Sequence, residues 1–320
     1  LRASALEGDD SPTLGRRRRA SFRHRNPSEG NFERSRNAEQ NFGRLHRQTD
    51  RANRERRRPR LLPRRGRSER VRACRQYFDE NGNYIIYYAV DIAFVGENLD
   101  RFNGSSFVLA NDIDMTGITY TPVGQTTVGQ NLLEFDGNGK KITNLSITSG
   151  EHAALFGKMF HFNIHDLTIE RAKMSGTYAA TILAETDNSS DGSYTKKIEK
   201  CNVVDCEIGS GKYVGSIVAY SSSNTIVVNK CSVSESYIVS KYSEDSGATY
   251  KGHCGGIIGG CYGGTITECS VTNNTFDVLG DRTGLVVGSA WGGTFSVTTV
   301  NGNTGLDRNC GLTVANGTWN

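Results

Sequence analysis

A phrase that occurs five times between residues 153 and 300 constrains the fold of this chain more than any other feature. Its first half is a small residue, any residue, two bulky apolar residues and then Gly or Ala, at residues 153–157, 180–184, 215–219, 255–259 and 284–288. Its second half has apolar residues first and sixth and a small or apolar residue fourth, at residues 164–169, 198–203, 228–233, 266–271 and 295–300, with an earlier copy at 142–147. Successive second halves are 22, 34, 30, 38 and 29 residues apart. Two short apolar segments that repeat with variable loops predict a solenoid.

The composition of the second half indicates which kind of solenoid. Three apolar positions alternate with Asn, Lys, Glu and Ser, and the segment is too short and too rich in Thr and Val for a helix. A single coil cannot bury its inward face, but stacked coils share one core. Their strands would lie parallel at about 4.8 Å, and Gly or Ala would stand where the backbone turns. We therefore predict an all-β chain, a right-handed parallel β-helix of about six coils.

The distribution of charge divides the chain. Residues 1–75 contain 23 Arg, no Lys and 9 acidic residues, a net charge of +14, whereas the remainder carries −10. The first segment lacks periodicity and cannot bury enough surface to fold, so we predict that residues 1–75 are disordered. Three interpretations remain open for it: a nucleic-acid-binding tail, a plain linker, or translation of a wrong frame upstream of the folded domain.

Order is expected to begin near Gln76. Asn81-Gly82 lies between two aromatic stretches, as in a β-hairpin, and Asp91 precedes apolar residues at helical spacing as a possible N-cap. We expect residues 76–104 to form a hairpin and a short helix that cap the open end of the β-helix, which occupies residues 105–320.

The order of motifs after this helix resembles the GLUG-motif β-helix family. The motifs are residues 107–115 (FVLANDIDM), 121–124 (TPVG), 135–139 (FDGNG) and the repeated Gly-x-Ile-Ile-Gly units. Ala replaces Gly at Ala180, Ala184 and Ala219, which loosens the turn signal but keeps the residue small. The resemblance implies a module of large secreted or surface-attached bacterial proteins, found also in the N-terminal region of immunoglobulin-A-specific metallopeptidases.

The eight cysteines contain no CxxC pair, so a zinc site is not favoured. Cys201, Cys231 and Cys269 take the fourth position of successive repeats and are expected to stack inward as small apolar residues. Stacked strands of neighbouring repeats bring Cα atoms within disulfide range, so the oxidation state of these three cysteines stays open. No apolar run is long enough to span a membrane, and no signal peptide is visible.

Two sets of residues are candidate sites. Phe160, Tyr262 and Trp291 share one register and could form a platform for sugar rings, or a packing ladder over the corner of the coil. Asp112 and Asp114 face the same way on a strand and could bind calcium, or could bond to the backbone of a turn. His161 and His165 lack the HExxH context of a zinc site.

We interpret the chain as a non-catalytic, extracellular or cell-surface repeat module of a larger bacterial protein. It would be adhesin-like or stalk-like and bind glycan or host protein, without a catalytic residue, a cofactor or a membrane span in this fragment. Two alternatives are a carbohydrate-active β-helix enzyme, such as a polysaccharide lyase or hydrolase, and nucleic-acid binding through the Arg-rich segment. The enzyme is not favoured, because none of the few arginines of the folded part recurs near an acidic cluster in the repeat register. The nucleic-acid tail is not favoured, because residues 1–75 lack Lys, Ile and Tyr beside a domain rich in all three.

Overall fold

The computed structural model describes residues 77–98, 102, 104–124, 130–148, 150–186, 196–209, 211–242, 252–279, 282–307, 310–313 and 317–319. The chain divides into two compact units, Leu1–Arg70 and Val71–Asn320, and everything described below belongs to the second. The Arg-rich segment 1–75 lies outside the described residues, so the expectations about it stay predictions. Within the described part of the chain, no helix is both long and apolar enough to cross a membrane.

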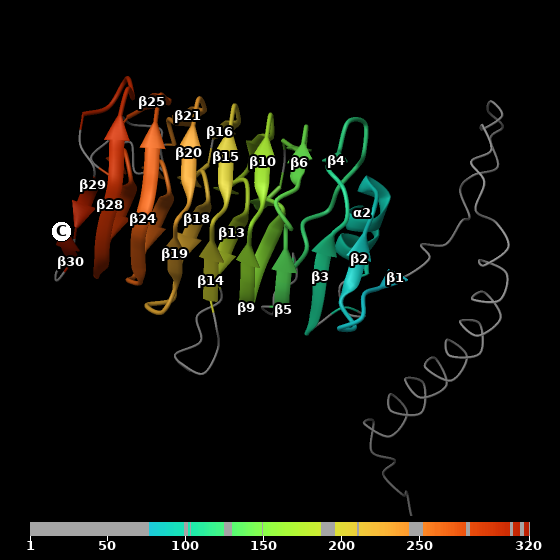
Figure 1. Cartoon of the computed structure of the whole chain (residues 1–320). Helices are drawn as coiled ribbons and strands as arrows, with labels where there is room; N and C mark the ends of the chain where they lie inside the picture. Colours follow the sequence, from blue (N-terminus) through green and yellow to red (C-terminus); the bar gives the residue numbers. More distant parts are fainter. Residues whose placement is uncertain are drawn as a thin grey trace, which may run out of the picture. The chain divides into compact units, whose positions relative to one another are not determined.

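Parallel β-strands make up most of the second unit, in one 20-stranded sheet and two five-stranded sheets. Strands of successive repeats lie side by side (Figure 1), and each pairs in parallel with its equivalents before and after it. We call the strands at one place in successive repeats a file. The mostly β, parallel architecture agrees with the sequence prediction.

We number the files in the order in which the chain passes through them. File 1 comprises β3 (Ser105–Leu109), β5 (Gln130–Asp136), the end of β9 (Phe156–His165), β14 (Lys196–Glu199), β19 (Val227–Asn229), the start of β24 (Thr265–Thr272), the start of β28 (Gly293–Asn301) and β30 (Gly317–Trp319). File 2 comprises β4 (Ile113–Asp114), β6 (Lys141–Thr143), β10 (Thr168–Glu170), β15 (Asn202–Val204), β20 (Ser232–Ser234) and the ends of β24 and β28. File 3 comprises β7 (Ser146–Ile147), β11 (Lys173–Ser175), β16 (Glu207–Gly209), β21 (Tyr237–Ser240) and β25 (Thr275–Val278).

The last two files flank the first half of the repeated phrase. File 4 comprises β8 (His152–Ala153), β12 (Tyr178–Ala179), β17 (Tyr213–Gly215), β22 (His253–Gly255) and β26 (Thr283–Gly284). File 5 comprises the start of β9, β13 (Leu183–Thr186), β18 (Val218–Ser221), β23 (Ile258–Cys261), β27 (Val287–Ala290) and β29 (Cys310–Thr313).

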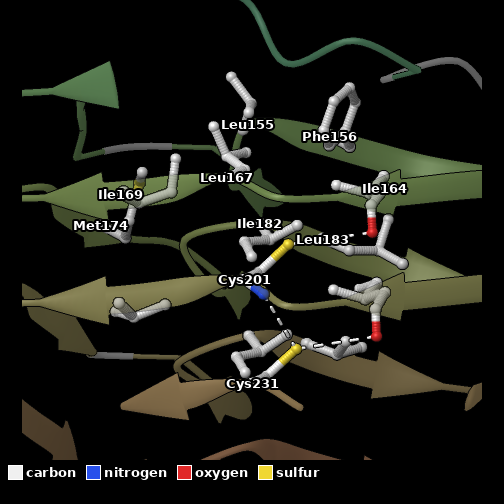
Figure 2. Packing of buried hydrophobic residues seen from close by; sticks show 14 of the residues in the cluster. Leu155, Phe156, Ile164, Leu167, Ile169, Met174, Ile182, Leu183, Cys201 and Cys231 are labelled. Carbon is white, nitrogen blue, oxygen red and sulfur yellow. Dashed lines mark hydrogen bonds between the residues drawn. The ribbon is translucent and has the colours of Figure 1, made fainter. Parts of the chain in front are cut away.

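The predicted inward positions of the second half are buried. In the first repeat Ile164, Leu167 and Ile169 are each 0% exposed. The equivalent residues are buried in the next three repeats: Ile198, Cys201, Val203, Val228, Cys231, Val233, Ile266, Cys269 and Val271. Side chains from successive strands point into this common interior (Figure 2), and one apolar cluster runs from Ile86 to Phe295. The shared core expected from the repeats is therefore present.

The first half of the phrase stacks in the same way. Its central apolar residues, Leu155, Ile182, Ile217, Ile257 and Val286, are all fully buried. The backbone N–H of Ile217 donates to Ile257 O at 3.1 Å, and the N–H of Ile257 donates to Val286 O at 2.9 Å. These residues lie above one another in successive repeats, as the sequence predicts.

The N-terminal part contains the predicted hairpin and helix. β1 (Tyr77–Phe78) pairs antiparallel with β2 (Tyr84–Ile86), and helix α2 follows at Ala89–Glu97. The sequence indicated Asp91 as the N-cap of this helix, but the N-cap is Tyr88. Asp91 is the third helical residue, and its carboxylate accepts the Tyr88 N–H at 2.9 Å. β2 also pairs in parallel with β3, so this strand belongs to the same sheet as the repeats.

Candidate functional site

Two of the three predicted aromatic residues form a stacked pair. Tyr262 follows β23 and Trp291 follows β27, so equivalent corners of adjacent repeats place the rings together. Their centroids are 5.0 Å apart and their planes differ by 17°. Tyr262 is 52% exposed, one of the most exposed large apolar side chains of the described chain.

Phe160 does not join this pair. It lies within β9, three strands away from β23 in file 5, and the Lys196 ammonium lies 5.8 Å from the centre of its ring. The predicted three-ring platform is therefore two separate features: a Tyr262–Trp291 pair and a Phe160–Lys196 contact.

A longer row of rings was not predicted from the sequence. His152, Tyr178, Tyr213 and His253 begin successive file 4 strands, and their rings stack at centroid distances of 5.2, 5.3 and 4.6 Å. His253 stacks on Trp291 at 6.0 Å. Tyr220 lies 4.4 Å from Tyr213 and 6.4 Å from Tyr262. We call this set the aromatic file: His152, Tyr178, Tyr213, Tyr220, His253, Tyr262 and Trp291.

The rings of the aromatic file rest on small residues. Tyr178 and Tyr213 pack against a separate cluster of Ala154, Ala180, Ala184 and Ala219, which come from the first half of the repeated phrase. The signal in the sequence is an aromatic residue or His one or two positions before that phrase in four consecutive repeats. This signal is visible only once the phrase is aligned between repeats.

Stacking fixes which parts of these rings a ligand can reach. Near-parallel rings one strand apart turn their faces toward one another, so a ligand could reach only ring edges; His152 and His253 are themselves buried. Burial and the nearby Glu185 carboxylate raise the pKa of Tyr178 to about 12, and burial raises the pKa of Tyr220. Both phenols therefore keep their protons near neutral pH and can donate hydrogen bonds.

Charged side chains accompany the N-terminal part of the aromatic file. Glu185 accepts from Lys158 Nζ at 3.2 Å, and its other oxygen lies 3.0 Å from His152 Nε2. Burial raises the pKa of Glu185, but hydrogen bonds from His152 and charge from Lys158 outweigh it, so the pKa is lowered overall. Glu185 is thus an ionised carboxylate held between two donors.

His253 and Ser289 contact each other but do not have the geometry of a nucleophile and its base. His253 Nδ1 hydrogen-bonds with the Ser289 hydroxyl, and Nε2 lies 3.1 Å from Arg282 Nη1. A guanidinium only donates, so Nε2 accepts and the ring proton is on Nδ1. His253 therefore donates to Ser289 and cannot take its proton in this arrangement.

The carboxylates of Asp112 and Asp114 are used by neighbouring backbone and side-chain groups. Asp112 Oδ1 accepts the N–H of Lys141 at 2.9 Å. Asp114 Oδ1 accepts from the Thr116 N–H, the Thr116 hydroxyl and Asn144 Nδ2 at 3.0, 2.7 and 2.8 Å. These bonds lower the pKa of Asp114, with Asn144 the main cause. Asp114 therefore bonds to the turn that follows it, whereas Asp112 bonds to the backbone of the next repeat.

A different cluster surrounds His165. Its Nδ1 lies 2.9 Å from Asp166 Oδ2 and 3.6 Å from Asp136 Oδ1, and its Nε2 lies 3.0 Å from Glu134 Oε1. Asp136, His165 and Asp166 are the group in the described part of the chain whose ligand atoms, all within 4.8 Å of one another, could hold a metal ion. The sequence did not single out this cluster, because its members come from two repeats.

The predicted thiol ladder is present. The N–H of Cys201 donates to Cys231 Sγ and the N–H of Cys231 donates to Cys269 Sγ, both at 3.4 Å, and Figure 2 shows the first of these contacts. The six cysteines whose side chains the structure describes are buried: Cys201, Cys206, Cys231, Cys254, Cys261 and Cys269. This agrees with their interpretation as small apolar residues.

Comparison with known proteins identifies a fold relative. No family model matches the sequence, and neither does any curated protein. Among solved structures, the chain is similar to the crystal structure of a Bacteroides ovatus protein named "putative immunoglobulin A1 protease". The match has a TM-score of 0.54 and 16% sequence identity, and it covers 76% of this chain and 85% of the other. At that identity the similarity concerns the fold alone. It is consistent with the immunoglobulin-A-protease part of the resemblance noted above and does not show the GLUG motif.

Proposed function

We propose that this chain is a non-catalytic repeat module of a bacterial surface or secreted protein, and that it binds a glycan or a protein through the aromatic file. We also propose that its five files wind as a right-handed parallel β-helix of about six coils, with β1, β2 and α2 covering one end. In-register parallel pairing through successive repeats and the similarity to the Bacteroides ovatus structure support this winding.

The continuity of the aromatic file is the observation that carries the proposed binding role. Seven rings contact one another across five repeats, and Tyr262 is half exposed. Tyr and Trp are enriched where binding energy concentrates, because they offer large contact area and few rotamers to immobilise. Stacking holds these rings in place before a ligand arrives, which lowers the entropy cost of binding.

The two alternative functions remain predictions. No observation in the described residues favours a carbohydrate-active enzyme: Asp112 and Asp114 accept hydrogen bonds from the chain itself, and His253 does not serve as a base for Ser289. Nucleic-acid binding would depend on residues 1–75, which lie outside the described chain.

A binding panel tests the proposal. The full chain is applied to a glycan array and to immobilised immunoglobulin A1, a probe chosen from the name of the Bacteroides ovatus protein. Removing both rings of the stacked pair in a Tyr262→Ala, Trp291→Ala variant should weaken any hit by at least about thirtyfold, the loss expected from removing one interface hot spot.

The matched control is Tyr237→Ala. Tyr237 is a similarly exposed tyrosine, at 40%, on file 3, and its loss should leave binding unchanged. Equal losses in both variants, unchanged binding by the double variant, or the absence of any hit by the parent chain would contradict the proposal.

A further inference from the structure

His165 lies at the end of β9, and each of its ring nitrogens faces a carboxylate group. Its Nε2 is 3.0 Å from Glu134 Oε1 on the neighbouring strand β5. Its Nδ1 is 2.9 Å from Asp166 Oδ2, in the corner that follows β9, and 3.6 Å from Asp136 Oδ1 at the end of β5. The imidazole thus lies among carboxylates from two adjacent repeats. Its side chain is 19% exposed, so a dissolved ion can reach it.

The contact with Glu134 determines which ring nitrogen can bind a cation. An ionised carboxylate only accepts hydrogen bonds, so Nε2 of His165 donates its proton to Glu134. Asn163 Nδ2 also donates to Glu134 Oε1, at 3.4 Å, and helps to hold that carboxylate. Nδ1 is then the nitrogen that faces the two aspartates. A metal-binding His donates its second ring N–H to a carboxylate in the same way, which fixes the orientation of the ring.

A metal ion can bind both aspartates at Nδ1, whereas a proton there can serve only one of them. The 2.9 Å distance to Asp166 has the length of a hydrogen bond, but the 3.6 Å distance to Asp136 is too long for one. Tetrahedral Zn²⁺ with bonds of about 2.0–2.1 Å separates its donor atoms by about 3.3 Å, which lies between these two distances. We propose that His165 Nδ1, Asp136 Oδ1 and Asp166 Oδ2 bind one Zn²⁺ ion.

The donor atoms favour a transition metal over calcium or magnesium. Calcium and magnesium take oxygen ligands, whereas an imidazole nitrogen suits zinc. The other contacts of the two aspartates leave the proposed donor atoms accessible: Asp166 Oδ1, not Oδ2, lies 3.9 Å from Lys200 Nζ. Asp136 Oδ1 accepts the N–H of Asn138 at 2.6 Å, which orients the carboxylate and leaves it a further lone pair. Three protein ligands leave the fourth position of a tetrahedral ion to water or to another ligand.

Backbone hydrogen bonds hold the two ligand-bearing corners together without a metal ion. The N–H of Gly137 donates to His165 O, and the N–H of Gly139 donates to Asp166 O, both at 2.8 Å. The arrangement belongs to this pair of repeats, because the place of His165 is taken in the following repeats by Glu199, Asn229 and Thr267. A zinc ion would add a connection through side chains between the repeats that contain β5 and β9.

This connection should make the folded chain more stable in the presence of zinc. A ligand that binds only the folded state stabilises it, so saturating Zn²⁺ should raise the melting temperature by several degrees and EDTA should reverse the shift. The site lies at the corner between files 1 and 2, whereas the aromatic file lies on files 4 and 5. Zinc binding and the glycan or protein binding proposed above are therefore measured independently.

Calorimetric titration of the full chain with ZnCl₂ at pH 7.5 tests the site. Cys74 and Cys310 are replaced by Ser in every sample, because their side chains lie outside the described part of the chain and thiolates bind zinc. The parent chain should show a saturable zinc site. His165→Gln and Asp166→Asn should each weaken binding at this site by at least about tenfold, since even the loss of a group that only orients a ligand has an effect of that size.

Two variants serve as matched controls. Asp205→Asn is compared with Asp166→Asn, because both aspartates have a φ of 52° and Asn tolerates this conformation. His161→Gln removes the other imidazole of β9. Both controls should keep the zinc affinity of the parent chain. Equal losses in Asp166→Asn and Asp205→Asn, or no saturable binding of Zn²⁺ by the parent chain, would overturn the proposal.

NMR of the chain with ¹⁵N-labelled histidine identifies the donor atom without any variant at the site. Added Zn²⁺ should shift the Nδ1 resonance of His165, and Nε2 should keep its proton because Glu134 accepts it. Binding of zinc through Nε2, or a His165 ring whose resonances do not change as zinc binds, would overturn the proposal.

Discussion

At the scale of single residues, the corners between files depend on an unusual backbone conformation. Ten described residues other than glycine have φ between 51° and 58°: Asn138, Asn144, Asp166, Arg171, Lys200, Asp205, Lys230, Glu235, Glu268 and Asn273. Asn and Asp tolerate this left-handed region through local hydrogen bonds. Lys, Arg and Glu have no such compensation, so the stack as a whole imposes the conformation on them.

Glu235→Gly tests how much strain one corner stores. Glu235 is exposed with a φ of 55°, and its N–H bond to Thr272 O does not need a side chain. Relief of the left-handed penalty, offset in part by the flexibility of Gly in the unfolded chain, should stabilise the protein by about 0.5–1 kcal/mol.

Urea denaturation gives the free energy of unfolding, with Glu235→Ala as the comparison. Alanine keeps its Cβ and remains strained, so it should bring no gain. A Gly variant no more stable than the Ala variant would show that the corner is unstrained.

At the scale of elements, the first half of the repeated phrase forms a corner that closes tightly between files 4 and 5. A Cβ added at Gly255 would lie 2.1 Å from Ile258 O, and one at Gly215 would lie 2.0 Å from Val218 O. Ala180 takes the equivalent place in an earlier repeat, so this close approach is specific to later repeats. The glycines here allow two strand segments to meet backbone to backbone.

Gly255→Ala should therefore destabilise the chain by about 3 kcal/mol, since the obstructing atom is backbone and cannot rotate away. Gly292→Ala is the control, because its Cβ would meet only Tyr262 O at 3.3 Å, and its effect should stay within about 0.5 kcal/mol. Melting temperatures of the two variants give the comparison, and similar values would contradict the tight corner.

At the scale of the whole molecule, the six thiols whose side chains the structure describes belong to the core. Burial, as the main cause, raises the pKa of Cys206 to about 11 and also raises that of Cys254. A thiol that stays protonated and buried is a poor nucleophile. Its modification therefore requires the stack to open.

Thiol titration with Ellman's reagent measures that opening. Cys74 and Cys310 are first replaced by Ser, because their side chains lie outside the described part. The remaining six thiols should be unreactive in the native chain at pH 8 and should all react after denaturation. Rapid reaction of Cys201, Cys231 or Cys269 in the native state would mean that the interior is accessible.

The sequence predicts the core of this fold better than its surface, for a physical reason. Burial acts on every repeat alike, so Ile164 and Leu155 recur as apolar residues at fixed places in the phrase. The aromatic file depends on residues such as Tyr178 and Tyr213, which are 35 positions apart and adjacent only after stacking. His165 and Glu134 meet across repeats in the same way, and Glu235 carries no local signal for a left-handed corner.

The register of the sheets persists although the repeats differ in length. Lys197 pairs with Val227, 30 residues on, whereas Val227 pairs with Thr265, 38 residues on. The additional residues lie between strands, so β19 stays in register with both β14 and β24. A foreign epitope or affinity tag could be inserted in the same way between two strands, and the paired strands on either side would keep their positions.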